Sequence, residues 1–265
     1  MRFDKEGFLS AGITTWMTKA RAEYVEWFQL ADQLNQEGMK LLFSAQPSHG
    51  NNKEFVAALL FGRALQAFQG SVLLSERGMG AEARTLVRNC AEAAIALGNV
   101  ALSETFLDEL IADYDKHRLT IANVFLNDPD CMSELPAPQL DKLRGVADAI
   151  NAQYHPNRPK DINWATAASK AGMTALYNTV YRGISGDAAH VTIDALTRHI
   201  KSDADNNVEH LTFRPSSDDL ADTLSAGASA ILHAMEALGR IFGQESVSNS
   251  VSRLGEVWRG LAIPA

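Results

Sequence analysis

Apolar residues along this chain recur mostly at steps of three and four, which is the repeat of an amphipathic α-helix. The first long stretch of this kind covers residues 13–45 and includes Trp16 and Trp27. It stops at a segment with Pro47 and Gly50, and both residue types oppose helix continuation. We therefore predict one long amphipathic helix followed by a loop.

The next helical stretch, about residues 53–77, is apolar on nearly all sides, so we expect it in the middle of a bundle. Asn51 stands three residues before Glu54, a spacing typical of a helix cap. Gly62 and Gly70 lower helix propensity inside this stretch. We interpret them as positions where another helix approaches closely.

The same repeat predicts further helices: one after residue 80, then about 103–127, 139–152, 163–184, 190–200, 216–242 and 247–261. Ser103, Asn163 and Ser216 are suited to cap three of them. Residues 201–207 read as a polar turn, and residues 208–213 look extended, as in one short strand or an ordered loop. The fold class is therefore all-α, a multi-helix bundle with short orthogonal helices and little or no strand. We expect a single domain over residues 1–265, with 128–162 as a peripheral excursion.

Composition agrees with a folded protein, because 46% of the residues are hydrophobic and 21% are charged. The formal net charge is −8, from 24 basic and 32 acidic residues. Strong non-specific attraction to nucleic acid or to an anionic membrane is therefore not expected, although a local basic patch is compatible with this total.

The first residues after Met1 show no apolar signal core, and no uninterrupted apolar run approaches the length of about 18 residues that a membrane span needs. We therefore expect a cytoplasmic protein that does not associate with membranes. The two cysteines, Cys90 and Cys131, have no metal-ligand spacing. No metal and no other cofactor are predicted.

One line of charged residues interrupts the apolar surface of the helix after residue 80. Arg84, Arg88 and Glu92 repeat at intervals of four and so share one helix face. Charges on a helix that is otherwise core-like need partners. Either they form a structural ion-pair network, or they belong to a functional site.

A second polar cluster lies within residues 177–199, which read as two helices joined at a tight break. Tyr181, Ser185, Asp187 and His190 gather at this joint. A histidine beside an aspartate is the usual arrangement for general acid–base chemistry. The alternative is a capped helix joint whose histidine only makes a structural hydrogen bond.

Several established site types are absent from the sequence. It contains no Glu-x-x-His, no His-Glu-x-x-His, no P-loop and no Gly-x-Ser-x-Gly, so di-iron, zinc-protease, NTPase and α/β-hydrolase sites are unsupported. A Ser185–His190–Asp triad lacks any surrounding motif.

Helical RNases of bacterial defence systems combine an arginine and a polar residue with a histidine a few positions on. Arg88 is followed by Asn89, but Ala94 and Ile95 stand where that histidine belongs. A rearranged site, with an arginine from one helix and His190 from another, remains physically possible.

The order of these features resembles an uncharacterised bacterial helical family, the domain-of-unknown-function family DUF5677. The resemblance covers about residues 55–242. Its features, in chain order, are Arg84-x-x-x-Arg88-x-x-x-Glu92, Tyr181-x-x-x-Ser185 running on to Ala189-His190, the stretch 194–199, and Phe213-Arg214-Pro215 before the last long helix. The resemblance implies an all-helical fold and a polar centre at these residues, and it brings no established activity.

Two functional hypotheses follow from these patterns. In the first, the protein is a phosphate-directed hydrolase or nuclease acting on a nucleotide or RNA. Its catalytic residues would be His190, Glu92, Ser185 and Tyr181, and its phosphate-binding residues Arg84, Arg88 and Asp187. In the second, it is a non-enzymatic interaction or structural module whose charged network only pins the bundle. Both hypotheses allow a homo-oligomer.

Overall fold

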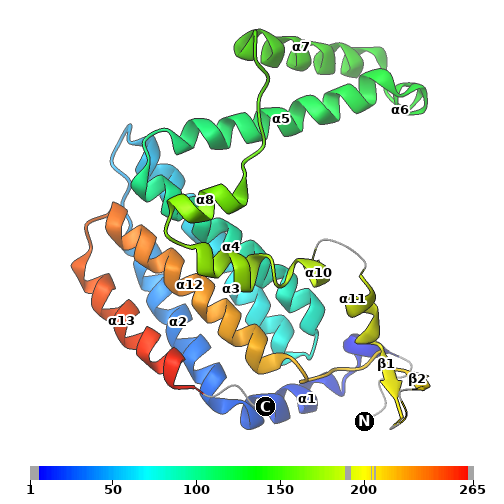
Figure 1. Cartoon of the computed structure of the whole chain (residues 1–265), viewed down its shortest axis with the longest axis vertical. Helices are drawn as coiled ribbons and strands as arrows, with labels where there is room; N and C mark the ends of the chain where they lie inside the picture. The colour runs from blue at the N-terminus through cyan, green and yellow to red at the C-terminus, as the bar shows by residue number, and fades with distance from the viewer. Residues whose placement is uncertain (1–5, 189–191, 204, 206, 262–265) are drawn as a thin grey trace. The chain divides into compact units, whose positions relative to one another are not determined.

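The structure is a computed structural model that describes residues 6–188, 192–203, 205 and 207–261 (Figure 1). Helices dominate these residues and one small two-stranded sheet accompanies them, which confirms the all-α class. The chain divides into two compact units. We call Met1–Leu102 with Trp164–Ala265 the bundle unit, and Ser103–Asn163 the hairpin unit. The single domain with an excursion at 128–162 stays a prediction.

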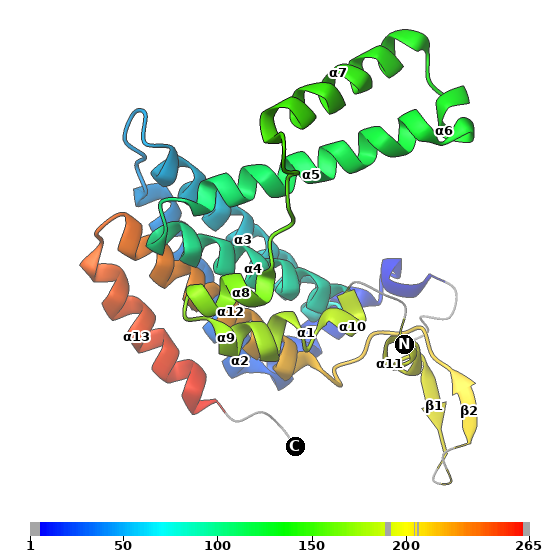
Figure 2. The ribbon, with the colours of Figure 1, turned by 45° about the horizontal axis from the view of Figure 1, so that its top comes forward.

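The bundle unit is built on three long helices that pack on one another, α3 (Asn52–Glu76), α4 (Gly80–Leu102) and α12 (Leu220–Ile241). Two more, α2 (Val25–Ser44) and α13 (Glu245–Gly260), pack against α12, as Figure 2 shows. The remaining helical elements are η1 (Gly7–Leu9), α1 (Ile13–Glu23), α8 (Trp164–Lys170), α9 (Thr174–Leu176), η2 (Tyr177–Tyr181), α10 (Ser185–Ala188) and α11 (Ile193–Thr197).

Helix α3 packs against α4, α12 and α2, but it is not enclosed on all sides as predicted. Three of its apolar side chains are more than half exposed: Phe55, Leu59 and Leu73. Phe61 and Phe68 lie in the core at no more than 1% exposure. A Cβ on Gly70 would lie 2.6 Å from Leu86 Cδ1 of α4, which confirms the predicted close approach there. At Gly62 the same prediction is wrong, because the nearest side-chain atom would be 4.0 Å away, an ordinary contact. By length and composition α3 could also cross a membrane, a test that core helices of soluble proteins pass as well.

The single helix predicted over residues 13–45 is in fact two helices, because the chain bends at Tyr24. Its backbone angles, φ −110° and ψ +37°, are not helical. The Tyr24 hydroxyl donates to the carbonyl of Ser217 at 3.4 Å, a contact 193 residues away in sequence. The predicted cap at Asn51 is confirmed, since its side chain accepts a hydrogen bond from the N–H of Glu54.

A small antiparallel sheet follows α11, formed by β1 (Ile200–Ser202) and β2 (Val208–Leu211). The extended stretch predicted at 208–213 is thus a strand in its first part. The helix predicted for 190–200 is shorter, at Ile193–Thr197, and residues 189–191 lie outside the described part of the chain. Asp203 accepts hydrogen bonds from the N–H groups of Asp205 and Asn207, and this closes the predicted polar turn.

The hairpin unit consists of α5 (Phe106–Asn127), the short α6 (Pro129–Ser133) and α7 (Ala137–Tyr154). Helices α5 and α7 pack together through a small apolar cluster: Leu119, Ala122, Ala147 and Ile150. The predicted cap at Ser103 is wrong, because α5 begins at Phe106 and Thr105 holds the N-cap position. Helix α6, which was not predicted, begins where Asp128 accepts from the N–H groups of Asp130 and Cys131.

Candidate functional site

The charged line of α4 faces the joint between η2 and α10, because both elements pack directly against α4. The joint starts with a π-helical turn, in which the N–H of Arg182 donates to the carbonyl of Tyr177 at 2.8 Å. Such wider turns are rare and often occur at functional sites. The two polar clusters singled out in the sequence therefore meet in space.

Arg88 is the centre of this meeting. Its Nη2 donates to the hydroxyl of Tyr181 at 2.7 Å, and its guanidinium carbon lies 4.1 Å from the centroid of the same ring. Two longer contacts complete the set, from Nε to Ser185 Oγ and from Nη1 to Glu92 Oε2, each at 3.4 Å. We call Arg88, Glu92, Tyr181 and Ser185 the polar corner.

A tight turn at Gly183 separates two residues of the polar corner, Tyr181 and Ser185. A Cβ there would lie 2.4 Å from the carbonyl oxygen of Thr179, so only glycine fits without a backbone shift. One turn later, Ser185 Oγ donates to the carbonyl of Tyr181 at 2.6 Å. The hydroxyl proton of Ser185 is therefore engaged with the backbone, while its oxygen remains an acceptor for Arg88.

Aromatic rings enclose the Tyr181 side of the corner. Tyr177 stacks on Tyr181 at 5.2 Å between centroids, and Trp164 lies 6.2 Å away. Burial raises the pKa of Tyr181 to about 12, and the negative charge of Glu92 adds to this effect while Arg88 opposes it. The phenol is therefore protonated at neutral pH, where it can donate a hydrogen bond but cannot act as a base.

The structure brings together four of the residues predicted for the site: Arg88, Glu92, Tyr181 and Ser185. Arg84 lies on the same face of α4, one turn earlier, and is partly buried. His190 and the side chain of Asp187 lie outside the described part of the chain, so their predicted roles are untested. Within the described residues, no group of three or more His, Cys, Asp or Glu side chains could hold a metal ion.

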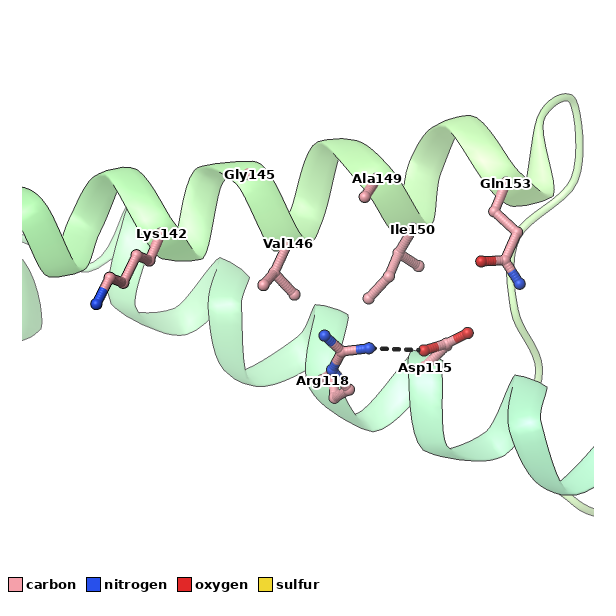
Figure 3. A pocket seen from close by; sticks show the side chains of 8 residues that line it. All are labelled: Asp115, Arg118, Lys142, Gly145, Val146, Ala149, Ile150 and Gln153. Carbon is pink, nitrogen blue, oxygen red and sulfur yellow. Dashed lines mark hydrogen bonds and ion pairs between the residues drawn. The ribbon is translucent and has the colours of Figure 1, made fainter.

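A groove in the hairpin unit, about 480 Å³ in volume, lies between α5 and α7 (Figure 3). Val146 and Ile150 point from α7 toward α5. Asp115 is 5% exposed and accepts hydrogen bonds from Arg118 at 3.1 Å and from the hydroxyl of Tyr154 at 3.2 Å. The bond from Tyr154 ties α7 to α5, whereas the contact between Arg118 and Asp115 lies within α5.

A larger cavity in the bundle unit, of about 550 Å³, was not predicted from the sequence. The first residues of α4 and of α12 line it, together with Arg198 and Arg214. The sequence does mark the two helix starts, through the break at Gly78–Gly80 and the helix start at Ser216–Asp219. It could not indicate that these starts, about 140 residues apart, lie beside one cavity.

The polar corner lies in a part of the chain that matches a known protein family. The model of a family of unknown function, DUF5677, matches residues 54–208, which is more than half of the chain. The chain belongs to the DUF5677 family. The match includes the whole polar corner and ends before Phe213–Pro215, which the sequence resemblance had included. Searches for similar curated proteins and for similar solved structures return no match.

Proposed function

We propose that this DUF5677 protein binds a phosphate ester at the polar corner and hydrolyses it. The proposal rests on the way Arg88 is held and on the hydrogen-bond donors it has left. Its guanidinium lies over the Tyr181 ring and donates one hydrogen bond of 2.7 Å, to Tyr181, and two of 3.4 Å, to Ser185 and Glu92. A guanidinium has five N–H donors, and three are used here, so two remain for an anion. Arginine in a fixed orientation is well suited to bind phosphate oxygens.

The other residues take roles that follow from their chemistry. Arg84, one turn from Arg88 on the same face, adds positive charge for the phosphate, and Asp187 helps to place the ligand. Tyr181 donates a hydrogen bond from its neutral hydroxyl, and Glu92 holds Arg88 in position. In the hydrolysis we propose, water attacks phosphorus and the bond to the leaving oxygen breaks. His190 removes the proton from water and returns one to the leaving group.

Activity assays on variants test this proposal. Nucleotides and short RNA are incubated with the wild-type protein, and with Arg88→Ala and His190→Ala. We expect loss of at least about a hundredfold in rate for each, the usual scale for an acid–base or charge-stabilising group. Arg63→Ala is the matched control, because Arg63 is an exposed arginine on α3 and its loss changes the net charge equally. Retention of full activity in His190→Ala contradicts the mechanism.

A second candidate function rests on the same contacts. Arg88 connects α4 to η2 and to α10, which is what a purely structural network would also do. In that case function lies on a surface, and α5 presents exposed apolar side chains at Ile111, Tyr114, Ile121 and Val124. Two measurements distinguish these proposals. If the wild-type protein has no hydrolytic activity and the Arg88→Ala variant unfolds readily, the results favour the interaction module.

We also place the protein in the cytoplasm. Both cysteines are free thiols, and the buried Cys90 has its pKa raised to about 12 by burial. A reducing compartment suits unpaired thiols. Fluorescent tagging in the source cells tests this placement.

A further inference from the structure

The cavity of about 550 Å³ in the bundle unit lies at the point where α4 and α12 both begin. Its volume falls within the range of small-molecule sites. Its lining includes aromatic side chains such as Trp16, hydroxyl groups such as those of Ser75 and Thr223, and both basic and acidic side chains. None of the four residues of the polar corner lines it.

The start of α4 presents first-turn backbone N–H groups to the cavity, and the start of α12 lies beside it. The first-turn residues Gly80, Ala81 and Glu82 of α4 all line it. At α12 the N-cap residue Asp219 makes no capping hydrogen bond, because its carboxylate pairs with Arg198 instead. First-turn N–H groups and the helix dipole together favour an anion at such a place.

A backbone hydrogen bond joins the segments that precede α4 and α12. Gly78 has φ +68°, and its carbonyl accepts a hydrogen bond from the N–H of Ser216 at 3.2 Å. A Cβ on Gly78 would lie 2.7 Å from that same nitrogen. The wall of the cavity is therefore built by a close contact between segments that precede α4 and α12.

Buried polar groups beside the cavity lack partners. Ser75 and Thr223 are 3% and 1% exposed, and their hydroxyls have no hydrogen-bond partner among the described residues. The indole N–H of Trp16 is likewise buried and unpartnered there. Ser71, one turn before Ser75 on α3, contrasts with these groups because its hydroxyl donates to the carbonyl of Phe68 at 2.7 Å. Buried polar groups are normally satisfied, so three orphans around one cavity indicate a missing partner.

The charges of the lining favour an anion that also carries hydrogen-bond donors. Lys19, Lys201 and Arg214 form no ion pair within the described part of the chain, and they line the cavity of a protein whose net charge is −8. Glu82 and Asp218 line it too, and carboxylates accept hydrogen bonds from hydroxyl or amino groups. These carboxylates would repel a simple polyanion. A ligand that carries both an anionic group and hydroxyl or amino donors fits the lining.

We infer that this cavity is a binding site for a nucleoside monophosphate or a phosphate ester of similar size. The phosphate lies at the starts of α4 and α12 near the free cations. The ring system lies against Trp16 and Phe8, and the sugar hydroxyls or ring amino groups donate to Glu82 and Asp218. This site goes beyond the proposed function, because it shares no residue with the polar corner.

Calorimetric titration of the full chain with AMP, GMP, CMP, UMP and inorganic phosphate tests the inference. We expect at least one nucleotide to bind, at least about tenfold more tightly than inorganic phosphate. Tryptophan fluorescence should change on binding to the wild type and much less in Trp16→Phe. Thr223→Val and Ser75→Ala remove one hydroxyl each, and each should weaken binding about three- to tenfold, the usual scale for one lost hydrogen bond.

Two controls assign any binding to this cavity. Ser71→Ala removes a buried hydroxyl of the same helix outside the cavity lining, and it should bind the nucleotide as the wild type does. Arg88→Ala removes phosphate binding at the polar corner, so any binding that remains in this variant is assigned to the cavity, and Thr223→Val and Ser75→Ala should weaken it further. Absence of nucleotide binding at millimolar concentration overturns the inference. So does unchanged affinity in both Thr223→Val and Ser75→Ala. Loss of binding in Arg88→Ala, with the cavity variants unaffected, would place the ligand at the polar corner instead.

Discussion

The guanidinium of Arg88 lies 4.1 Å from the centroid of the Tyr181 ring and donates to the hydroxyl of the same residue at 2.7 Å. The two residues are 93 positions apart in sequence, on α4 and η2. One side chain thus makes both a ring contact and a charged hydrogen bond to one partner. This pair joins the charged line of α4 to the helix joint, and it is the basis of the polar corner.

The Arg88–Tyr181 contact should be separable into a hydrogen-bond part and a ring part. Tyr181→Phe removes only the hydroxyl, and we expect it to lower the free energy of unfolding by about 1–2 kcal/mol, since the donor is charged and half-buried. Arg88→Ala removes both parts and should cost more. Urea unfolding of the two single variants and the double variant gives the coupling energy. Additive effects would show that the hydrogen bond to the Tyr181 hydroxyl contributes nothing to stability.

Gly183 should be the most sensitive glycine of the joint. In Gly183→Ala the added Cβ meets the carbonyl oxygen of Thr179 at 2.4 Å, so the backbone must shift and we expect a loss of about 1–3 kcal/mol. Gly62→Ala is the control, because its Cβ finds an ordinary contact at 4.0 Å inside α3. That variant should gain about 0.5–1 kcal/mol from improved helix propensity. Thermal unfolding measures both, and equal effects would contradict the steric argument.

Ser71 and Ser75 offer a matched pair on one helix. Both are buried, but only the hydroxyl of Ser71 has a hydrogen-bond partner among the described residues. In the absence of ligand, Ser71→Ala should lower stability by about 1 kcal/mol, whereas Ser75→Ala should leave it unchanged or raise it. Denaturant unfolding of the two variants checks this order. The reverse order would mean that the Ser75 hydroxyl is satisfied in the free protein.

Alkaline pH should destabilise the protein partly through Tyr181. Its pKa is raised to about 12 in the folded state, against about 10 for an unfolded tyrosine. Between these values the unfolded chain has lost the proton while the folded protein keeps it, so stability falls as pH rises from about 10 to 12. Below pH 10 this contribution is constant. Unfolding measured across this range should show a shallower decline in Tyr181→Phe, and an identical decline would contradict the raised pKa.

Much of the helical framework was predictable because helix formation depends on neighbours three and four residues apart. The repeat of apolar positions located the long helices, and Asn51 was confirmed as a cap. The apolar surface of residues 53–77 predicted a helix enclosed by others, but one face of α3 is exposed at Phe55, Leu59 and Leu73. The alignment of Arg84, Arg88 and Glu92 was likewise certain once their segment was helical. Errors arose where a distant contact acts on the chain, as at Tyr24, whose hydroxyl bonds to Ser217.

Tertiary packing alone decided which helix faces meet. The sequence contains both Arg88 and Ser185, but no local pattern states that residues 97 positions apart come within hydrogen-bond distance. The same holds for the cavity, whose walls come from the starts of α4 and α12. Periodicity shows which side of a helix is buried. The partner of that side depends on how the shapes of many side chains fit together, and this fit exists only in the folded chain.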